Sequence, residues 1–180
     1  MPEIEIRPAQ AEDIPYLVQI DHDFVSDYVW QMDIQHSDEG QISVQFRQVR
    51  LPRSVKVEYP RFYHSLQVDW EQRDGLLVAL HHGEVVGYIS LALNNVPLTT
   101  SVTDLAVVHK MRHQGIATAL ILSAGEWARQ HACSRLVLEI QPKNYPAIRL
   151  AKKLSFDFCG FNDRYYPNLD IALFFAKSLR

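Results

Sequence analysis

The residues most able to do chemistry lie at one junction between a strand and a helix, in the segment LAVVHKMRHQGIATAL. Arg112, Gly115 and Ala117 lie between a strand expected over residues 101–109 and a helix expected over residues 115–131. A helix N-terminus presents unpaired N–H groups and the positive end of its dipole, which together favour an anion. Glycine lets the backbone approach that anion closely, and arginine adds a fixed positive charge. This junction therefore predicts a site for a phosphate group.

The same residues allow other interpretations. The junction lacks the Gly-Lys-Ser/Thr of a P-loop and the GxGxxG of a dinucleotide-binding fold, so neither of those sites is expected. A strand that leads into a capped helix, with no ligand, would also have this sequence. His109 and His113 have the spacing of zinc ligands on a helix, but they flank a loop and no third ligand is close in sequence. We therefore expect no metal site.

Hydrophobic periodicity predicts the elements that must position this junction. An apolar stripe that begins at Ile14 and extends to Val25 predicts an N-terminal helix. The segment NYP at 144–146 begins another helix, with Asn144 as its N-cap. Because strand, helix and strand follow one another between residues 101 and 141, those two strands are expected to be parallel. Strands are expected over residues 3–7, 76–82, 85–93, 101–109, 135–141, 156–161 and 170–179.

Two further predictions concern less regular parts of the chain. Residues 28–70 are expected to form an irregular excursion with one or two edge strands, because Pro52 and Pro60 interrupt the alternation of apolar residues. Cys159 falls within an apolar strand and is expected to be a buried, inert thiol.

The composition is typical of a globular protein: 180 residues, of which 47% are hydrophobic and 22% charged. It predicts a single domain over residues 1–180 and excludes a disordered, collagen-like or coiled-coil chain. No apolar run could span a membrane and the N-terminus has no signal-peptide core, so a cytoplasmic protein is expected. Residues 1–40 hold ten acids and one base, Arg7, and the other bases are spread along the chain. We therefore expect no nucleic-acid partner.

The segment RHQGIA at 112–117 matches the pattern Gln/Arg-x-x-Gly-x-Gly/Ala of the GNAT superfamily of N-acyltransferases, which this chain resembles. The resemblance continues in Arg7-Pro8, in TDLAV at 103–107 and in LEIQPKN at 138–144. Residues 138–175 are most similar to the streptothricin-acetyltransferase-like branch. The resemblance implies a mixed α/β fold, the acyl-CoA N-acyltransferase fold, with a central sheet of about six to seven strands and about four flanking helices.

The resemblance also implies an activity: transfer of an acetyl group from acetyl-CoA to a primary amine, by direct attack in a ternary complex. Strand backbone groups would pair with the pantetheine arm, and loop amides would hold the pyrophosphate. The partners would be acetyl-CoA and the amine, with no membrane partner, and the chain would be a monomer or a homodimer. The residues implied in cofactor binding are Leu105, Ala106, Val107, Arg112, His113, Gln114, Gly115, Ile116, Ala117 and Asn144.

Catalysis by such an enzyme needs a neutral amine. An alkyl amine with a pKa near 10 is only about 0.1% neutral at pH 7, and a general base contributes roughly 10²- to 10⁴-fold in rate. The resemblance assigns this role to Asp104, although Asp104 could simply pair with a neighbour. The tyrosine that serves many family members as general acid is replaced here by Ala151. Tyr166, or the adjacent Tyr165, is the candidate that remains.

The acceptor is less well defined by the sequence. Four N-terminal aspartates, Asp21, Asp23, Asp27 and Asp33, could form a negatively charged mouth that attracts a cationic small molecule. They could equally serve only to keep the surface soluble. Two other functions stay open: a protein acetyltransferase of the N-terminal or lysine type, and a CoA-binding regulatory module without catalysis. Ala151 in place of tyrosine favours the latter.

Overall fold

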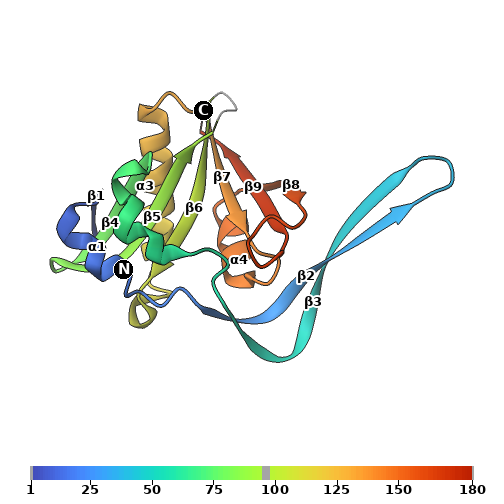
Figure 1. Ribbon diagram of the computed structural model, residues 1–180, viewed down its shortest axis with the longest axis horizontal. Coiled ribbons are helices and arrows are strands. Elements are labelled where there is room, and N and C mark those ends of the chain that lie inside the picture. Colours follow the sequence, from blue (N-terminus) through green and yellow to red (C-terminus); the bar gives the residue numbers. More distant parts are fainter. Residues whose placement is uncertain (1, 95–97, 180) are drawn as a thin grey trace.

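The computed structural model describes residues 2–94 and 98–179, and a seven-stranded sheet forms its centre (Figure 1). The strand order is β1-β4-β5-β6-β7-β9-β8. β6 and β7 are parallel, and the other neighbours in this sheet are antiparallel, which confirms the predicted mixed sheet and the predicted parallel pair. The strands are β1 Glu5–Pro8, β4 Gly75–His81, β5 Glu84–Leu93, β6 Thr99–Val107, β7 Arg135–Ile140, β8 Asp157–Asn162 and β9 Ala172–Ser178.

Helices cover both faces of the sheet. The helices α3 (Ile116–Gln130) and α4 (Tyr145–Lys153) cover one face and bury alternate strand residues such as Leu77 and Ile89. The short helices α1 (Ile14–Leu17) and α2 (Leu66–Asp69) cover the other face over Leu76, Val78 and Tyr88. Short 3₁₀ turns at 11–13, 63–65, 70–72 and 109–111 complete the helical part. The sheet thus has two hydrophobic layers, as a period-2 alternation on half-buried strands requires.

The N-terminal helix is much shorter than the sequence predicts. It ends at Leu17, and the chain is extended again from Phe24, where β2 (Phe24–His36) begins. Val25, expected to complete the apolar stripe, is 59% exposed on this strand. The guanidinium of Arg112 holds the backbone carbonyls of Asp21 and Asp23. That tertiary contact fixes an extended path that helical periodicity could not reveal.

Residues 28–70 are far more regular than expected. β2 and β3 (Ile42–Val57) form a long antiparallel ribbon outside the main sheet, and Figure 1 shows it extending well beyond the body. Pro52 lies where the register shifts between Ser26 and Tyr28. A proline at a bulge removes no ladder hydrogen bond, so the strand passes through it. The expected strands are therefore present, but the prediction that this segment is irregular is wrong for residues 28–57.

Cys159 also differs from its prediction, because its thiol is exposed. It lies on β8, the outermost strand, beside a register shift between Phe158 and Gly160. An edge strand has no neighbour on one side, and an irregularity there turns side chains outward. No helix among the described residues is long and apolar enough to cross a membrane.

Candidate active site

β6 and β7 pair over only part of their length, which opens a gap between them. Their parallel register covers Thr99–Val102 against Arg135–Leu138 and no later residues. In the pairing of β5 with β6, Ser90 faces Asp104 but Leu91 faces Val102, so that Thr103 is a bulge at the point of separation. A bulge bends a strand and changes the direction of the residues beyond it. The C-terminal half of β6 is thereby directed away from β7.

The free edge of β6 can be identified from its hydrogen-bond alternation. Val108 N–H donates to the Val86 carbonyl of β5 at 2.9 Å. Because bonded residues alternate along an antiparallel ladder, Ala106 faces β5 in the same way. Leu105 and Val107 then direct their backbone groups toward the gap. Two of the three predicted strand residues, Leu105 and Val107, therefore direct backbone atoms toward the gap. The backbone groups of Ala106, which lies between them, pair with β5 instead.

The loop between β6 and α3 presents backbone amides at the end of this gap. His113 and Gly115 both have left-handed backbones, with φ of 62° and 90°. Gly115 is the N-cap of α3, and no side chain caps that helix end. Successive N–H groups in such a turn form a concavity that binds anions. The positive φ explains why glycine occupies position 115, and the uncapped amides beyond it, from Ile116 and Ala117, remain open to a ligand.

Arg112 has a different role from the one expected of a free cation. Its Nε donates to the Val107 carbonyl at 2.9 Å, and its Nη1 donates to the Asp23 carbonyl at 2.8 Å. Its Nη2 donates to the Asp21 carbonyl. The side chain thus ties the loop to the start of β2. Its positive charge stays beside the loop, but its donors serve protein carbonyls.

Asn144 is the N-cap of α4, as predicted. Its Oδ1 accepts a hydrogen bond from the Ala147 amide at 3.1 Å. The residue lies just after β7, on the side of the gap opposite Leu105. Its contact with a cofactor stays a prediction.

Asp104 is buried on β6 and has several partners. The Tyr59 hydroxyl donates to its Oδ1, and Arg73 Nη1 lies 3.2 Å from its Oδ2. Thr103 Oγ1 lies 3.3 Å from the same oxygen. Asp104 is therefore an ion-paired, hydrogen-bonded carboxylate, and its link toward the surface runs through the Tyr59 phenol. Burial and the nearby Asp104 charge raise the pKa of Tyr59 well above its usual value.

A buried histidine extends this polar cluster. His22 Nδ1 lies 2.6 Å from the Ile20 carbonyl, and Nε2 lies 2.7 Å from the Tyr88 hydroxyl. A carbonyl can only accept, so Nδ1 carries the proton and Nε2 accepts from Tyr88. The ring stacks on Tyr63 with 3.8 Å between centroids. Burial lowers the pKa of His22 to about 4, so the imidazole is neutral at pH 7.

A second polar cluster lies on β7, on the same face of the sheet. Glu139 forms an ion pair with Arg61 and accepts a hydrogen bond from the Tyr165 hydroxyl at 2.9 Å. The Arg61 guanidinium lies 5.6 Å from the centre of the Tyr165 ring and 5.2 Å from that of Tyr166. A carboxylate and two aromatic rings thus surround one cation. This combination is typical of sites that bind ammonium or guanidinium groups.

Tyr166 belongs to this second cluster. Its side chain is 4% exposed. Burial raises the pKa of its phenol, so the hydroxyl is protonated at neutral pH. Within the described chain the hydroxyl has no hydrogen-bond partner. The hydroxyl is a protonated donor that a ligand could use.

The four N-terminal aspartates do not gather at one place. Asp23 forms an ion pair with Lys56 at 3.0 Å and accepts from the Tyr59 amide at 3.0 Å. Asp27 accepts from Ser54 at the bulge of the ribbon. Asp33 faces Gln45 near the outer end, roughly 33 Å along the strand from Asp23 at about 3.3 Å per residue. The negative charge close to the gap comes from Asp104 and Glu139 instead.

Sequence reasoning missed several residues of these clusters. Glu139 could have been found, because the alternation of β7 places it on the face opposite Leu138. Tyr59, Arg61 and Arg73 offered no such signal, since their positions depend on how the chain returns from the ribbon. His109 and His113 stay exposed, and the described residues contain no group of three or more His, Cys, Asp or Glu side chains placed to hold a metal ion.

Comparisons with known proteins place these observations in context. The model of the acetyltransferase (GNAT) family matches residues 44–156. A streptothricin acetyltransferase from Streptomyces lavendulae is 27% identical over 84 residues, 47% of this chain and only 44% of that protein. An N-alpha-acetyltransferase from Saccharolobus solfataricus is 28% identical over 142 residues, 73% of this chain and 85% of that protein.

One solved structure extends the likeness over almost the whole chain. It is that of a Bacillus anthracis str. Ames protein, assigned as a streptothricin acetyltransferase and solved in complex with acetyl coenzyme A. It superposes with a TM-score of 0.75 at 22% identity and covers 98% of this chain and 99% of that one. At this identity the likeness establishes the fold and confirms the predicted acyl-CoA N-acyltransferase architecture.

Proposed function

This chain belongs to the acetyltransferase (GNAT) family, and from that membership we propose that it moves an acetyl group from acetyl-CoA to a primary amine of a cationic small molecule. One observation carries the proposal: the separation of β6 from β7, whose free edge leads directly to the uncapped N-terminus of α3. A backbone-lined gap that ends at an anion-binding helix terminus fits an extended thioester with a pyrophosphate at one end.

The cofactor would be held mainly by backbone atoms. The amides of Gln114, Gly115, Ile116 and Ala117 are available to the pyrophosphate, with His113 at the start of the turn. The edge groups of Leu105 and the N–H of Val107 would be available to the pantetheine arm, opposite Asn144. Arg112 supports this arrangement by fixing the Val107 carbonyl and the loop.

The chemistry is a direct displacement. The amine nitrogen attacks the thioester carbon, a C–N bond forms, the C–S bond breaks, and CoA leaves as a thiolate. A backbone N–H at the β6 edge would stabilise the developing oxyanion, a contribution of about 10²–10³ in rate. The amine must lose a proton and the thiolate must gain one, so a base and an acid are needed.

Asp104 would act as the base through Tyr59. The amine proton passes to the Tyr59 oxygen while the phenol proton moves to the Asp104 carboxylate, to which it is already hydrogen-bonded. Through this relay, the Asp104 carboxylate could accept the proton of the amine although it is buried and ion-paired. Tyr166 would act as the acid, since its phenol is protonated at neutral pH and its hydroxyl is not used by the described chain.

The Arg61 side chain supports a cationic acceptor. Its guanidinium is held by Glu139 and by the rings of Tyr165 and Tyr166. A site that stabilises one internal cation has the chemistry to bind a second of the same kind, either beside Arg61 or in its place. A polyamine or an amino-sugar compound with several ammonium groups has that chemistry.

A second candidate function is acetylation of protein N-termini. It is favoured by the similarity to the Saccharolobus solfataricus N-alpha-acetyltransferase, which extends over 73% of this chain. A peptide α-amine would undergo the same displacement. The two candidates differ in the acceptor, not in the cofactor site.

The test has two stages. Isothermal titration with acetyl-CoA should give binding in the micromolar range. Release of CoA is then measured with three acceptors: a polyamine, a primary monoamine with no further charged group, and short peptides with free N-termini. Preference for the polyamine supports the proposal, and preference for peptides replaces it with the second candidate. Binding without release for every amine would leave a regulatory module, and no binding at all would refute the cofactor site.

A further inference from the structure

The guanidinium of Arg112 joins the proposed cofactor loop to a distant part of the chain. Its Nε donates to the carbonyl of Val107, at the end of β6, at 2.9 Å. Its Nη1 donates to the carbonyl of Asp23 at 2.8 Å, and its Nη2 donates to that of Asp21. A planar guanidinium presents its donors in a fixed fork, so these bonds set both distance and orientation. Arg112 therefore fixes residues 21–23 against the end of β6.

Residues 21–23 in turn hold Tyr59. Oδ1 of Asp23 accepts a hydrogen bond from the Tyr59 amide at 3.0 Å. The ring of His22 lies beside the Tyr59 ring, with 5.0 Å between their centres. His22 is itself fixed, because its Nε2 lies 2.7 Å from the hydroxyl of the fully buried Tyr88. The place of Tyr59 thus depends on the segment that Arg112 holds.

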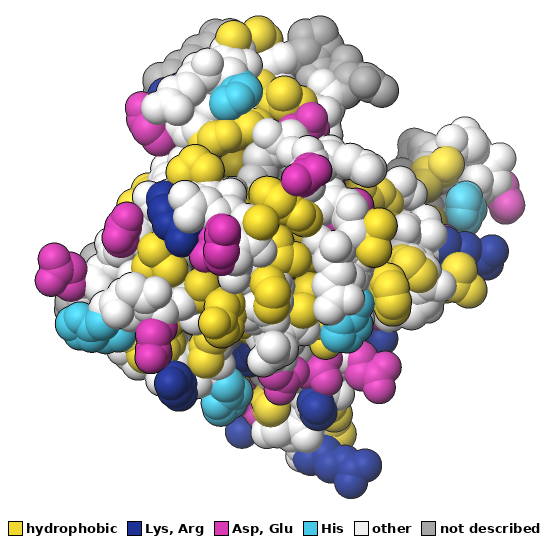
Figure 2. Space-filling model, turned by 60° about the vertical axis from the view of Figure 1, so that its left-hand side comes forward, with side chains coloured by type: hydrophobic (Ala, Val, Ile, Leu, Met, Phe, Trp, Pro, Cys, Tyr) yellow, Lys and Arg dark blue, Asp and Glu magenta, His cyan; other side chains and the backbone are white. Residues whose placement is uncertain are grey.

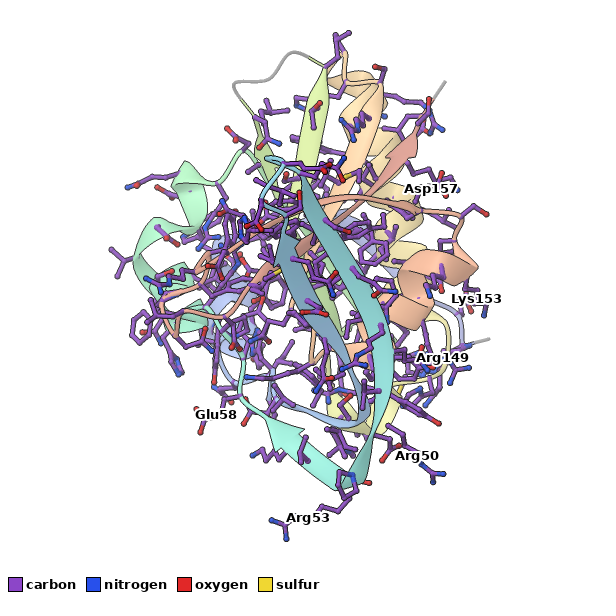
Figure 3. All side chains as sticks on the ribbon, turned by 90° about the vertical axis from the view of Figure 1, so that its right-hand side faces the viewer. Arg50, Arg53, Glu58, Arg149, Lys153 and Asp157 are labelled. Carbon is purple, nitrogen blue, oxygen red and sulfur yellow. The ribbon has the colours of Figure 1, made fainter. Side chains whose placement is uncertain are left out.

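Tyr59 follows directly on the long ribbon and lies outside the regular structure. β3 ends just before it, and Figure 3 shows the exposed Glu58 where the chain leaves the ribbon. Residues 58–62 belong to no helix or strand. The backbone at Tyr59 is therefore held by its contact with Asp23 rather than by a ladder of hydrogen bonds.

The Tyr59 hydroxyl completes a continuous path of contacts. It donates to Oδ1 of the buried Asp104. The path runs from the Arg112 guanidinium to the Asp23 carbonyl, and from the Asp23 carboxylate to the Tyr59 amide. At its other end, Arg112 lies shortly before Gly115, the N-cap of α3. One side chain thus connects the uncapped helix end with the carboxylate.

We propose that Arg112 is a positioning residue that places the Tyr59 hydroxyl against Asp104, acting through Asp23. This role rests on the proposed function, in which Tyr59 and Asp104 remove the proton of the amine. Because the same guanidinium holds the end of β6, it fixes the relay relative to the edge that would bind the thioester. Misplacement of a reacting group by about 1 Å can lower a rate by about 10²-fold, so such support matters.

Two other roles for these residues lead to different expectations. As a charge beside the pyrophosphate, Arg112 would set the affinity for acetyl-CoA, and another cation could replace it. As part of a negatively charged mouth, Asp23 would set KM for a polyamine, and loss of its charge would raise that KM. A positioning role depends instead on the fork of the guanidinium and on an acceptor oxygen at position 23, and on neither charge.

The first experiment compares variants that keep a charge with variants that keep a hydrogen bond. Arg112→Lys keeps the positive charge, but one ammonium cannot hold the three carbonyls in the same geometry. It should lower kcat with a polyamine by about tenfold and change the dissociation constant of acetyl-CoA by less than about threefold. Asp23→Asn keeps an oxygen for the Tyr59 amide and should retain kcat within about threefold, whereas Asp23→Ala should lose about tenfold.

Arg129→Lys is the matched control for the arginine. The Arg129 Nε donates to the Leu179 carbonyl at 2.8 Å, so this substitution also removes a guanidinium from a backbone carbonyl. Arg129 lies in the last turn of α3, at the end opposite Gly115. The control should change kcat and the dissociation constant by less than about twofold.

A second readout separates positioning from a general loss of structure. The relay removes a proton, so it matters most for an amine that is protonated at pH 7. We compare kcat/KM for ethylamine with that for 2,2,2-trifluoroethylamine, which has the same carbon skeleton and is much less basic. Arg112→Lys and Asp23→Ala should lose about tenfold with ethylamine and less than about threefold with the fluorinated amine. Asp104→Asn should show the same selectivity with a larger loss.

The outcomes distinguish this role from the proposed function. No loss in Asp104→Asn with ethylamine would remove the relay itself, and the role of Arg112 with it. If Asp104→Asn shows the selectivity, positioning by Arg112 is refuted by wild-type kcat in Arg112→Lys or by equal losses with both amines. It is also refuted if Asp23→Asn loses as much as Asp23→Ala. Circular dichroism melts verify folding, and the Asp23 pair gives an independent answer if Arg112→Lys is unfolded.

Discussion

The proposed cofactor side and the proposed acceptor side of the gap between β6 and β7 differ in what they present to a ligand. The cofactor side is a continuous stretch of backbone from Leu105 to Ala117, shaped by a bulge and two left-handed residues. The acceptor side is a set of side chains from six separate segments: His22, Tyr59 to Tyr63, Arg73, Asp104, Glu139 and the Tyr165–Tyr166 pair. A backbone site depends on local conformation, whereas a side-chain site depends on tertiary contacts. The two sides should therefore respond differently to substitution.

Asp104→Asn should have the largest effect and should fall on the acceptor side alone. Loss of the base lowers kcat by about 10²- to 10⁴-fold, while the dissociation constant of acetyl-CoA stays unchanged. Tyr59→Phe should give a similar loss, because it cuts the relay to Asp104. CoA-release kinetics and calorimetry separate the two quantities. Normal turnover in Asp104→Asn would remove Asp104 from the mechanism.

Gly115→Glu should act on the cofactor side alone. A left-handed backbone and a like charge beside the pyrophosphate together weaken acetyl-CoA binding by roughly 100-fold. Gly83→Glu is the matched control, because Gly83 has a φ of +82° and open space around it in the β4–β5 turn. It should bind acetyl-CoA normally in calorimetry. Equal loss in both variants would mean that backbone strain, not the site, is responsible.

His22, on the acceptor side, should make the free energy of unfolding decrease at acid pH. The pKa of His22 is lowered by burial from 6.5 to about 4, so the unfolded chain binds this proton more readily. The contribution of neutral His22 to the free energy of unfolding is complete above pH 6.5 and is lost as the pH falls toward 4. At pH 5 the loss is about 2 kcal/mol. Urea unfolding at pH 7 and pH 5 measures it, and His22→Asn, which keeps a donor to Ile20, should show a smaller difference. An identical pH dependence in that variant would exclude His22 as the cause.

Glu139→Gln should sharpen the comparison within the acceptor side. Removal of this carboxylate should raise KM for a polyamine by about tenfold and leave KM for a monoamine unchanged, since one desolvated charge pair is lost. Arg61→Ala should lower KM for the polyamine, because the Arg61 guanidinium no longer competes with the polyamine for Glu139 and the two tyrosine rings. Equal KM changes for both amines would show that the effect is structural.

Asp33→Asn should have the smallest effect. This residue lies near the outer end of the ribbon, so KM for the polyamine should change by less than about twofold even at low salt. A change as large as that of Glu139→Gln would place the ribbon tip at the acceptor site.

The difference between local conformation and tertiary contacts also explains how much of the structure could be predicted from the sequence. Strand alternation, helical periodicity and the Asn144 cap are local signals, and they correctly predicted the sheet, the parallel pair and the two long helices. The start of α3 at Gly115 could be predicted because it depends on a local glycine turn, whereas phosphate binding by this loop stays a prediction. The ribbon was missed because Pro52 looks like an interruption, and only the pairing shows that it occupies a bulge.

The acceptor side was missed for a related reason. Asp104 was noticed as an isolated carboxylate, but its partners Tyr59 and Arg73 lie 45 and 31 positions away. Burial of a charged side chain requires such partners. No periodicity within one strand can identify them.

Charge on the surface follows a similar division. Figure 2 shows acidic, basic and histidine side chains interspersed among apolar ones on the face that carries β1 and α1. The tip of the ribbon instead carries acids alone, Asp33, Asp38 and Glu39. At the base of the ribbon, acids and bases lie side by side again, as Asp23 pairs with Lys56.

The base of the ribbon has one more consequence. Asp23, just before β2, accepts a hydrogen bond from the amide of Tyr59, just after β3. The two ends of a segment longer than thirty residues thus meet within 3.0 Å. The contact closes the ribbon at its base, where Trp30 and Phe46 pack on the core aromatics Phe158 and Phe175. The outer part of the ribbon, beyond these two residues, could therefore be shortened or lengthened without exposing the core.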